Sequence, residues 1–316
     1  MMKNRCLYCY KELAEGEVDY HKKCTKVFYG VDIAPILPYR LDEMENLAKE
    51  SVQNSITVPG VQPKLSLGWI RDVLNDGHQG RLTILDALDG HYILKPQNAL
   101  YSQMPENEHL SMKLAELFKI KTVPSAMIRL LTGELCYITK RIDRNADGSK
   151  NHMIDFLQIL ELEHKYKGSM ELVGKKIGEL SNNTLLDKRR FLELAIFNYI
   201  IGNNDMHLKN FSMFKDHHFG WVLSAAYDLL NVKIILPSDK DDTALMLGGK
   251  KQNFNIGYFN RLAEVLGLNE KQIQTIFKRI QVWKPRALQL IENSFLNENN
   301  KLAYKILVEE RVRLFI

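Results

Sequence analysis

This sequence has no long hydrophobic runs and no large excess of charge of one sign. No apolar stretch of the 316-residue chain approaches the roughly 18 residues that a transmembrane helix needs, and its start, MMKNRCLYCYKEL, lacks the apolar core of a signal peptide. We therefore expect a cytoplasmic protein that does not contact a membrane. The net charge of +5 is far from the dense basic footprint of a dedicated nucleic-acid binder.

Cysteine is also scarce. Only four cysteines are present, and three of them lie in the first 24 residues beside a histidine, which is not a secreted disulfide framework. Cys6, Cys9, His21 and Cys24 follow the pattern C-x2-C-x11-H-x2-C, a ligand set that tetrahedral Zn²⁺ accepts. Two interpretations stay open for residues 1–30: a small zinc knuckle, or a short leader whose reduced cysteines are merely packed.

The rest of the chain divides by its periodicity. A composition of 45% hydrophobic and 26% charged residues excludes disordered and fibrous classes. Short strands are predicted at 64–70, 81–88, 91–96 and 134–142, with one helix embedded at 105–120. Beyond them the patterns become long and helical, beginning with DFLQILELE. The sequence predicts an α+β fold of two lobes: a β-rich N-terminal lobe over 31–140 and a mostly α-helical C-terminal lobe over 141–316.

A cluster of polar residues directly follows the apolar run FLELAIFNYIIG. Asp205 and Asn210 lie five positions apart in NNDMHLKN, and Asp228 follows in AYDLLNV. Such oxygen ligands suit Mg²⁺, and a carboxylate can orient a hydroxyl nucleophile, so the trio fits phosphoryl transfer. The Asp-x4-Asn spacing is that of the protein-kinase catalytic loop. The alternative is a loop whose Asp and Asn cap helices and turns.

The upstream half of the chain supports the kinase interpretation. HYILKP places Lys95 on a strand, and the following helix offers Glu106 and Glu108 as ion partners. Before them, VPGVQPK is a Gly/Pro loop in which Gly60 permits close approach to phosphate and Lys64 adds charge. Each of these features alone is weak evidence for a kinase, but their order and spacing together are much stronger evidence.

These stretches resemble the HipA-like serine/threonine kinases, toxins of bacterial toxin–antitoxin systems. The matching stretches, from residue 60 to about 254, are GVQPKLSL, YILKPQ, PENEHLSMKLA, YITKRIDR, DFLQIL, GNNDMHLKNFS, AYDLLNV and LGGKKQNF. HipA itself begins with an extra small subdomain, whereas here the Gly-rich loop arrives by residue 60. In this the chain resembles the short HipT type of three-component HipBST systems.

The resemblance implies a two-lobe protein-kinase-like fold that uses ATP and Mg²⁺. It implies a protein substrate, typically an aminoacyl-tRNA synthetase whose phosphorylation halts translation, with growth inhibition and persistence as consequences. The implied partners are a HipB-like DNA-binding antitoxin and a HipS-like small antitoxin protein, so that DNA is reached only through the antitoxin.

The resemblance also implies roles for individual residues. Asp205 orients the substrate hydroxyl and accepts its proton, Asn210 and Asp228 hold Mg²⁺, and Lys95 pairs with the ATP phosphates. Lys209 is expected near the γ-phosphate as a second catalytic group. The remaining ATP-binding residues are the phosphate-covering loop, the segment between the lobes and a loop brace, namely Val58, Pro59, Gly60, Val61, Gln62, Lys64, Lys140, Arg141, Ile142 and His207.

Members of this family silence themselves by phosphorylating a hydroxyl residue just before the Gly-rich loop. A phosphate there adds negative charge and three acceptor oxygens, which can eject the loop from the ATP site. In this chain NSIT offers Ser55 and Thr57. Thr57 matches the position of HipA's single Ser, and Ser55 is favoured as at least one site. The alternative is that both hydroxyls simply satisfy turn N–H groups.

Two other functions remain open at the level of sequence. Kinase-like folds also phosphorylate small hydroxylated molecules with the same Asp-x4-Asn chemistry, so a small-molecule kinase is the first alternative. A catalytically weak kinase-fold binding module, or an adaptor that uses the Cys/His segment to hold a partner, is the second. The complete set of Lys95, Asp205, Asn210 and Asp228 favours an active kinase over this second alternative.

Overall fold

The computed structural model describes residues 4–44, 46, 64–71, 80–85, 90–145 and 147–316. The chain forms two compact units. One comprises Met1–His109, Val123–Lys150 and Asn293–Phe295, and the other Leu110–Thr122, Asn151–Glu292 and Leu296–Ile316. The three-part division into residues 1–30, 31–140 and 141–316 stays a prediction.

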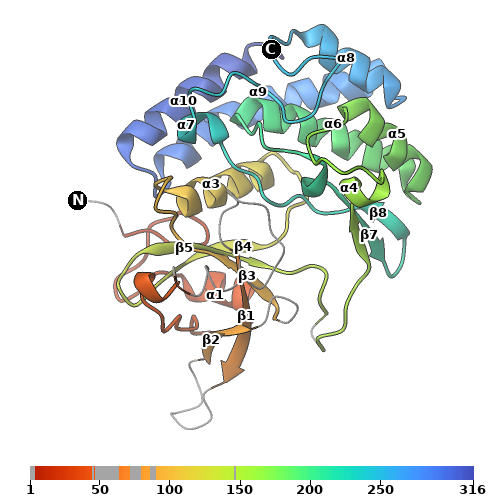
Figure 1. Ribbon diagram of the computed structural model, residues 1–316. Helices are drawn as coiled ribbons and strands as arrows, with labels where there is room; N and C mark the ends of the chain where they lie inside the picture. Colours follow the sequence, from red (N-terminus) through yellow and green to blue (C-terminus); the bar gives the residue numbers. More distant parts are fainter. Residues whose placement is uncertain (1–3, 45, 47–63, 72–79, 86–89, 146) are drawn as a thin grey trace. The chain divides into compact units, whose positions relative to one another are not determined.

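A five-stranded antiparallel sheet is the centre of the first unit. Its strand order is β2-β1-β3-β5-β4. Helix α1 (Lys22–Tyr29) lies beside this sheet, and the rings of Phe28 and Tyr29 contact Tyr92 (Figure 1). The strands are β1 (Leu65–Arg71), β2 (Gly80–Leu85), β3 (Tyr92–Lys95), β4 (Ser125–Arg129) and β5 (Leu135–Lys140).

The elements predicted for this half of the chain are present. The four predicted strands correspond to β1, β2, β3 and β5, and the predicted helix is α3 (Met104–Leu117). Strand β4 was not predicted, because SAMIR is short and buried at four successive positions and so lacks the alternation of a half-exposed strand. Helix α3 is almost entirely buried, although five of the six residues from Glu106 to Ser111 are polar. These buried polar side chains need hydrogen-bonding or charged partners.

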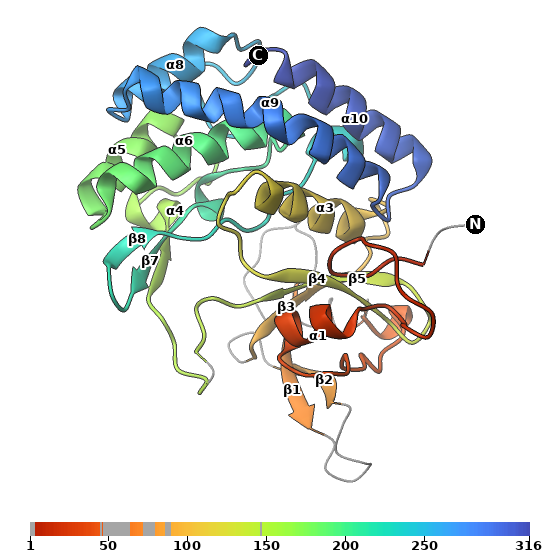
Figure 2. The same cartoon turned by 180° about the vertical axis from the view of Figure 1, so that it is seen from behind.

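The second unit is mostly helical and carries a small antiparallel sheet of order β6-β7-β8. Figure 2 shows its long helices running beside one another. The helices are α4 (Phe156–Ile159), α5 (Met170–Leu180), α6 (Thr184–Ile201), α7 (Val232–Ile235), α8 (Ile256–Val265), α9 (Glu270–Glu292) and α10 (Glu298–Val312). The strands are β6 (Met153–Asp155), β7 (Ser212–Asp216) and β8 (Gly220–Leu223), and a short 3-10 helix, η1, covers Leu208–Asn210.

Helix α6 is the core of this unit. Every residue from Phe191 to Ile201 is buried, and α6 contacts α5, α8 and α10. A helix that is hydrophobic all round belongs in the interior of a unit. At one end of the core the rings of Phe118, Phe197 and Trp283 pack together, and the Trp283 indole donates to the carbonyl of Leu114 at 3.0 Å. The segment that follows α6 therefore starts from a firmly packed element.

One prediction for this region was wrong, and one sheet was missed. The helical pattern DFLQILELE forms only the four residues of α4, because a capping box at Asp155 fixes its start and Glu161 adopts a left-handed φ of 52° just beyond it. The β6-β7-β8 sheet was not predicted, since its strands have three to five residues. Among the described residues no helix is long and apolar enough to cross a membrane.

Candidate active site

The loop after α6 is fastened at its start by two asparagines. Gly202 ends the helix with a left-handed φ of 77°. Asn203 donates to the side chain of Asn198 at 2.9 Å and accepts from the backbone N–H of Asp205 at 3.3 Å. Asn204 donates to the carbonyl of Asp241 at 2.8 Å. These bonds fix the backbone that carries Asp205.

Asp205 and Asn210 share this turn. The amide nitrogen of Asn210 donates to the backbone carbonyl of Asp205 at 3.1 Å, which leaves the side-chain oxygen of Asn210 as the atom suited to a metal. The carboxylate of Asp205 is half-exposed and accepts a hydrogen bond from the hydroxyl of Tyr166 at 2.7 Å. The predicted pair thus meets within one turn, and Tyr166 joins it from a segment 39 residues earlier.

His207 lies beside the same carboxylate. Its Nε2 is 3.9 Å from Oδ1 of Asp205, and its ring makes an edge contact with Tyr166 at 5.3 Å between centroids. Burial lowers the pKa of His207, while the negative charges of Asp205 and Asp228 oppose that change. His207 is therefore mostly neutral near pH 7, and it is close enough to both aspartates for their charges to act on it.

Asp228 is held near the loop by its neighbour. The hydroxyl of Tyr227 donates to the carbonyl of Lys209 at 3.0 Å and lies 2.5 Å from the hydroxyl of Ser212. Asp228 itself has a left-handed φ of 59°, an uncommon conformation for a residue with a side chain. Backbone strain of this kind concentrates at functional sites. The side chain of Lys209, in contrast, is exposed.

The first unit holds the predicted phosphate-binding lysine in a buried ion pair. Nζ of Lys95 lies 2.5 Å from Oε1 of Glu108, and the two side chains are 5% and 2% exposed. Of the two carboxylates offered by the sequence, Glu108 is the partner. Glu106 instead accepts from Gln97 at 2.9 and 3.1 Å, and burial raises its pKa.

The other predicted ATP-binding residues are only partly described. Burial lowers the pKa of Lys140, whose Nζ lies 5.5 Å from the centre of the Phe28 ring. Arg141 makes two hydrogen bonds with Asp143, at 3.0 and 2.9 Å. Ile142 is half-buried and Lys64 is exposed. The predicted residues that lie outside the described part of the chain are Ser55, Thr57, Val58, Pro59, Gly60, Val61 and Gln62.

The Cys/His pattern at the start of the chain converges in space. The ligand atoms of Cys6, Cys9, His21 and Cys24 all lie within 4.8 Å of one another. All four cysteines of the chain, Cys136 included, are free thiols. This convergence favours the zinc knuckle over a leader whose reduced cysteines are merely packed.

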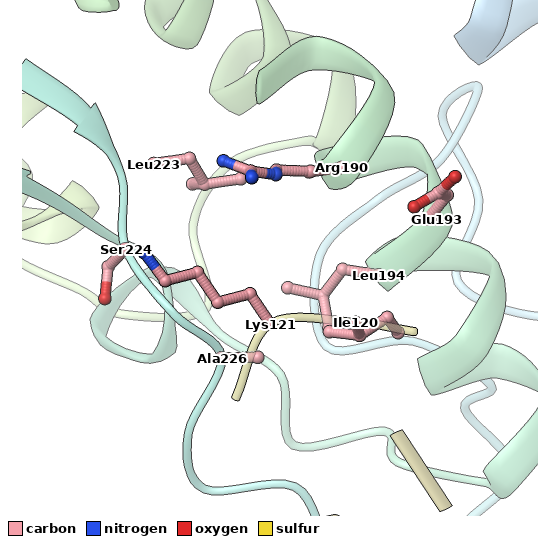
Figure 3. A pocket seen from close by; sticks show the side chains of 8 residues that line it. All are labelled: Ile120, Lys121, Arg190, Glu193, Leu194, Leu223, Ser224 and Ala226. Atoms are coloured by element: carbon pink, nitrogen blue, oxygen red, sulfur yellow. The ribbon is translucent and has the colours of Figure 1, made fainter. Parts of the chain in front are cut away.

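A small pocket in the second unit does not include the candidate catalytic residues. It lies between α6, β8 and the segment after α3 (Figure 3). Glu193 on its wall accepts from Arg189 and pairs with Arg279 at 3.0 Å, and Arg190 pairs with Asp187, so its charges are largely matched. The lining residues are Ile120, Lys121, Arg190, Glu193, Leu194, Leu223, Ser224 and Ala226.

Sequence reasoning missed two residues that shape the site, Tyr166 and Tyr227. Each reaches the loop after α6 from another segment through one hydroxyl group. No spacing rule connects them to Asp205, and EHKYKGS is an ordinary polar loop. The one signal for Tyr227 is its place next to Asp228.

The arrangement is that of a kinase-like fold, and the comparisons identify the family. The chain belongs to the HipA-like C-terminal domain family, which it matches over residues 56–286. It is 26% identical to a "Putative kinase" of Haemophilus influenzae, over 93% of this chain and 92% of that protein. It is 32% identical to "Putative kinase Y4dM" of Sinorhizobium fredii over 60% of this chain, and this match spans about half, 48%, of that relative's length.

Solved structures share the fold. HipA of Shewanella oneidensis MR-1, solved with HipB and its operator DNA, matches with a TM-score of 0.67 at 19% identity, over 88% of this chain and 71% of that one. The proinflammatory kinase CtkA of Helicobacter pylori matches with a TM-score of 0.51 at 16% identity, over 71% and 87%. The predicted kinase-like α+β fold is confirmed, and the resemblance to the HipA-like family is confirmed as membership. The assignment to the short HipT type stays a prediction.

Proposed function

We propose that this chain is an ATP- and Mg²⁺-dependent serine/threonine protein kinase that acts as the toxin of a bacterial toxin–antitoxin system. The observation that carries the proposal is the turn in which the side chain of Asn210 donates a hydrogen bond to the backbone carbonyl of Asp205. Asp228 is close enough for its charge, like that of Asp205, to act on His207. Membership of the HipA-like family and relatives named as kinases support it.

In this proposal Asp205 orients the hydroxyl of the substrate and accepts its proton. Its carboxylate is half-exposed, as a group that must meet a protein substrate needs to be. The side-chain oxygen of Asn210 and the carboxylate of Asp228 hold Mg²⁺. When bound, the metal ion neutralises charge on the transferring phosphoryl group. His207 braces the loop. Because burial lowers its pKa, it adds no full positive charge beside the metal ion.

Lys95 contacts the phosphates of ATP, and Glu108 fixes the position of its ammonium group. The carboxylate 2.5 Å away holds the end of the buried lysine in one position, as a residue that contacts phosphate requires. Lys209 is exposed and able to reach toward the γ-phosphate. The further ATP-binding residues proposed are Val58, Pro59, Gly60, Val61, Gln62, Lys64, Lys140, Arg141 and Ile142.

The regulation and partners proposed follow those of the family. Ser55 and Thr57 are the proposed autophosphorylation sites. HipA of Shewanella oneidensis was solved with HipB and operator DNA, and a HipB-like DNA-binding protein is the proposed antitoxin here. A small HipS-like protein is proposed as a second antitoxin, and an aminoacyl-tRNA synthetase as the substrate.

Phosphate transfer from radiolabelled ATP, with and without Mg²⁺, tests the proposal. Wild type is expected to label itself on the peptide that contains Ser55 and Thr57, and to arrest growth when expressed. Asp205→Asn removes the acceptor and is expected to lower the rate by about 100-fold or more. Asp216→Asn is the matched control, because Asp216 ends β7 and its side chain accepts hydrogen bonds from the N–H groups of His218 and Phe219, a role that asparagine keeps.

Two outcomes would overturn the proposal. One is equal labelling by wild type and Asp205→Asn, which would point to a contaminating kinase. The other is turnover of small hydroxylated metabolites without any protein phosphorylation, which would instead assign a small-molecule kinase.

A further inference from the structure

We propose that Cys6, Cys9, His21 and Cys24 form a structural zinc site that fastens the N-terminal segment to the sheet of the first unit. The family match begins at residue 56 and does not cover these residues. Within the part of the chain that the structure describes, this is the one cluster of its kind, with its four ligand atoms within 4.8 Å of one another.

The two distances from the histidine nitrogen to the cysteine sulfurs match those of a tetrahedral centre. Zn–S bonds of about 2.3 Å and Zn–N bonds of about 2.0–2.1 Å put two sulfurs about 3.8 Å apart and a sulfur and a nitrogen about 3.6 Å apart. Nδ1 of His21 lies 3.5 Å from Sγ of Cys9 and 3.7 Å from Sγ of Cys24. All four ligand atoms lie within 4.8 Å of one another, so small side-chain shifts would bring each of them to bonding distance from one ion.

The imidazole is already oriented as a metal ligand. Nε2 of His21 lies 2.9 Å from the backbone carbonyl of Glu12 and donates to it. That hydrogen bond places the proton on Nε2 and aims the lone pair of Nδ1 at the sulfurs. Histidines that bind zinc are held in this way by a carbonyl or carboxylate behind the ring.

The backbone supplies the two halves of a zinc knuckle. Cys6 and Cys9 flank a tight turn in which the N–H of Tyr10 donates to the carbonyl of Cys6 at 3.0 Å, and Tyr10 has a left-handed φ of 62°. His21 is the N-cap of α1 and Cys24 lies in its first turn. Cys24 thus lies at the end of the helix where the dipole favours a negatively charged ligand.

The site is closed, as a structural zinc site should be. Four protein ligands complete the tetrahedron, so no position remains for substrate or water. Cys6 is fully buried, and the neighbouring Leu7 accepts at its carbonyl from the N–H of Met127 in β4 at 3.0 Å. The same segment pairs Asp19 with Arg129 at 2.7 Å. Zinc would thus hold together a segment that borders the edge of the sheet.

The knuckle also reaches the helix that carries the partner of Lys95. The hydroxyl of Tyr10, one residue after Cys9, lies 2.8 Å from Nδ1 of His109, which follows Glu108 in α3. Loss of the metal is therefore expected to loosen β4 and the start of α3 together.

Metal analysis of the full-length protein tests the proposal. Protein purified without chelators is expected to contain about one zinc per chain by plasma mass spectrometry. Cys9→Ser and Cys24→Ser, both at half-buried positions, are expected to lose it and to lose amide-exchange protection at Leu7 and Met127. Cys136→Ala is the matched control, because Cys136 lies in β5 outside the cluster and should leave the zinc content unchanged.

A replacement that conserves ligation adds a second measurement. His21→Cys keeps four ligands and should retain the metal, whereas His21→Ala should not. If the serine variants are insoluble, cobalt-substituted wild type decides the question, since three thiolates give intense charge-transfer absorption. Wild type without bound zinc, Cys9→Ser with the full zinc content, or cobalt without charge-transfer bands would each overturn the proposal.

Discussion

The hydroxyl of Tyr166 donates a 2.7 Å hydrogen bond to Oδ1 of Asp205, from a loop 39 residues earlier in the chain. The contact restrains a half-exposed carboxylate whose Oδ1 also lies 3.9 Å from Nε2 of His207. Burial and this hydrogen bond to a carboxylate both raise the pKa of Tyr166, so its hydroxyl remains a donor at neutral pH. Tyr166 is accordingly a positioning residue for the proposed catalytic group.

Tyr166→Phe is expected to lower kcat about 10- to 150-fold, because it removes one hydrogen bond to a charged group, worth roughly 1.5–3 kcal/mol in such settings. Phenylalanine keeps the ring contact with His207, so the loop should remain folded. The measurement is steady-state phosphate transfer with kcat and KM for ATP determined separately. A change in the KM for ATP with kcat unaltered would contradict a role in positioning Asp205.

The buried pair of Lys95 and Glu108 predicts a pattern of stabilities. Lys95→Met leaves Glu108 buried without its cation, at an expected cost of roughly 3–5 kcal/mol in the free energy of unfolding. The double variant Lys95→Met/Glu108→Leu should recover most of that loss, because neither charge remains, and it should stay inactive. Urea denaturation measures both.

An exposed ion pair serves as the control for this prediction. Lys176 and Glu179 pair at 2.7 Å with side chains 36% and 43% exposed, so Lys176→Met should change stability by no more than about 1 kcal/mol. If Lys95→Met/Glu108→Leu is no more stable than Lys95→Met alone, the unpaired charge of Glu108 is not the cause of the lost stability.

Asp187 joins three elements of the second unit. It is fully buried and accepts hydrogen bonds from the hydroxyl of Ser181 at 2.6 Å, the N–H of Leu223 at 2.7 Å and Arg190 at 3.2 Å. Asp187→Ala leaves the hydroxyl of Ser181 and the N–H of Leu223 without this acceptor, and it should lower the free energy of unfolding by roughly 3 kcal/mol. Thermal unfolding provides the measurement, and a loss below about 1 kcal/mol would mean that water replaces the carboxylate.

Glu106 predicts a pH dependence. Burial raises its pKa above the ordinary 4.5, so in the window above 4.5 the folded state keeps a proton that the unfolded state releases. Its contribution to stability is complete below that window and is lost as pH rises through it. Glu106→Gln removes this dependence and should gain stability relative to wild type as the pH rises above 4.5. A difference between the two proteins that is independent of pH would refute the assignment.

Much of the fold followed from the sequence where the signal was local. The strands β1, β2, β3 and β5 and the helix α3 were readable from short-range patterns and turn residues. The same patterns overextended α4, since only the left-handed backbone at Glu161 ends it. They also omitted the short strands β6, β7 and β8, which exist because they pair with one another.

The sequence by itself determined the chemical types and their order: Lys95, then Asp205 and Asn210 at a fixed spacing, then Asp228, with the Cys/His ligands ahead of them. Only the tertiary structure decided the partners. It selected Glu108 over Glu106 for Lys95 and brought the hydroxyl of Tyr166 to Asp205. Local periodicity records which face of an element is buried, whereas contacts across 13 or 39 residues depend on how packed elements meet.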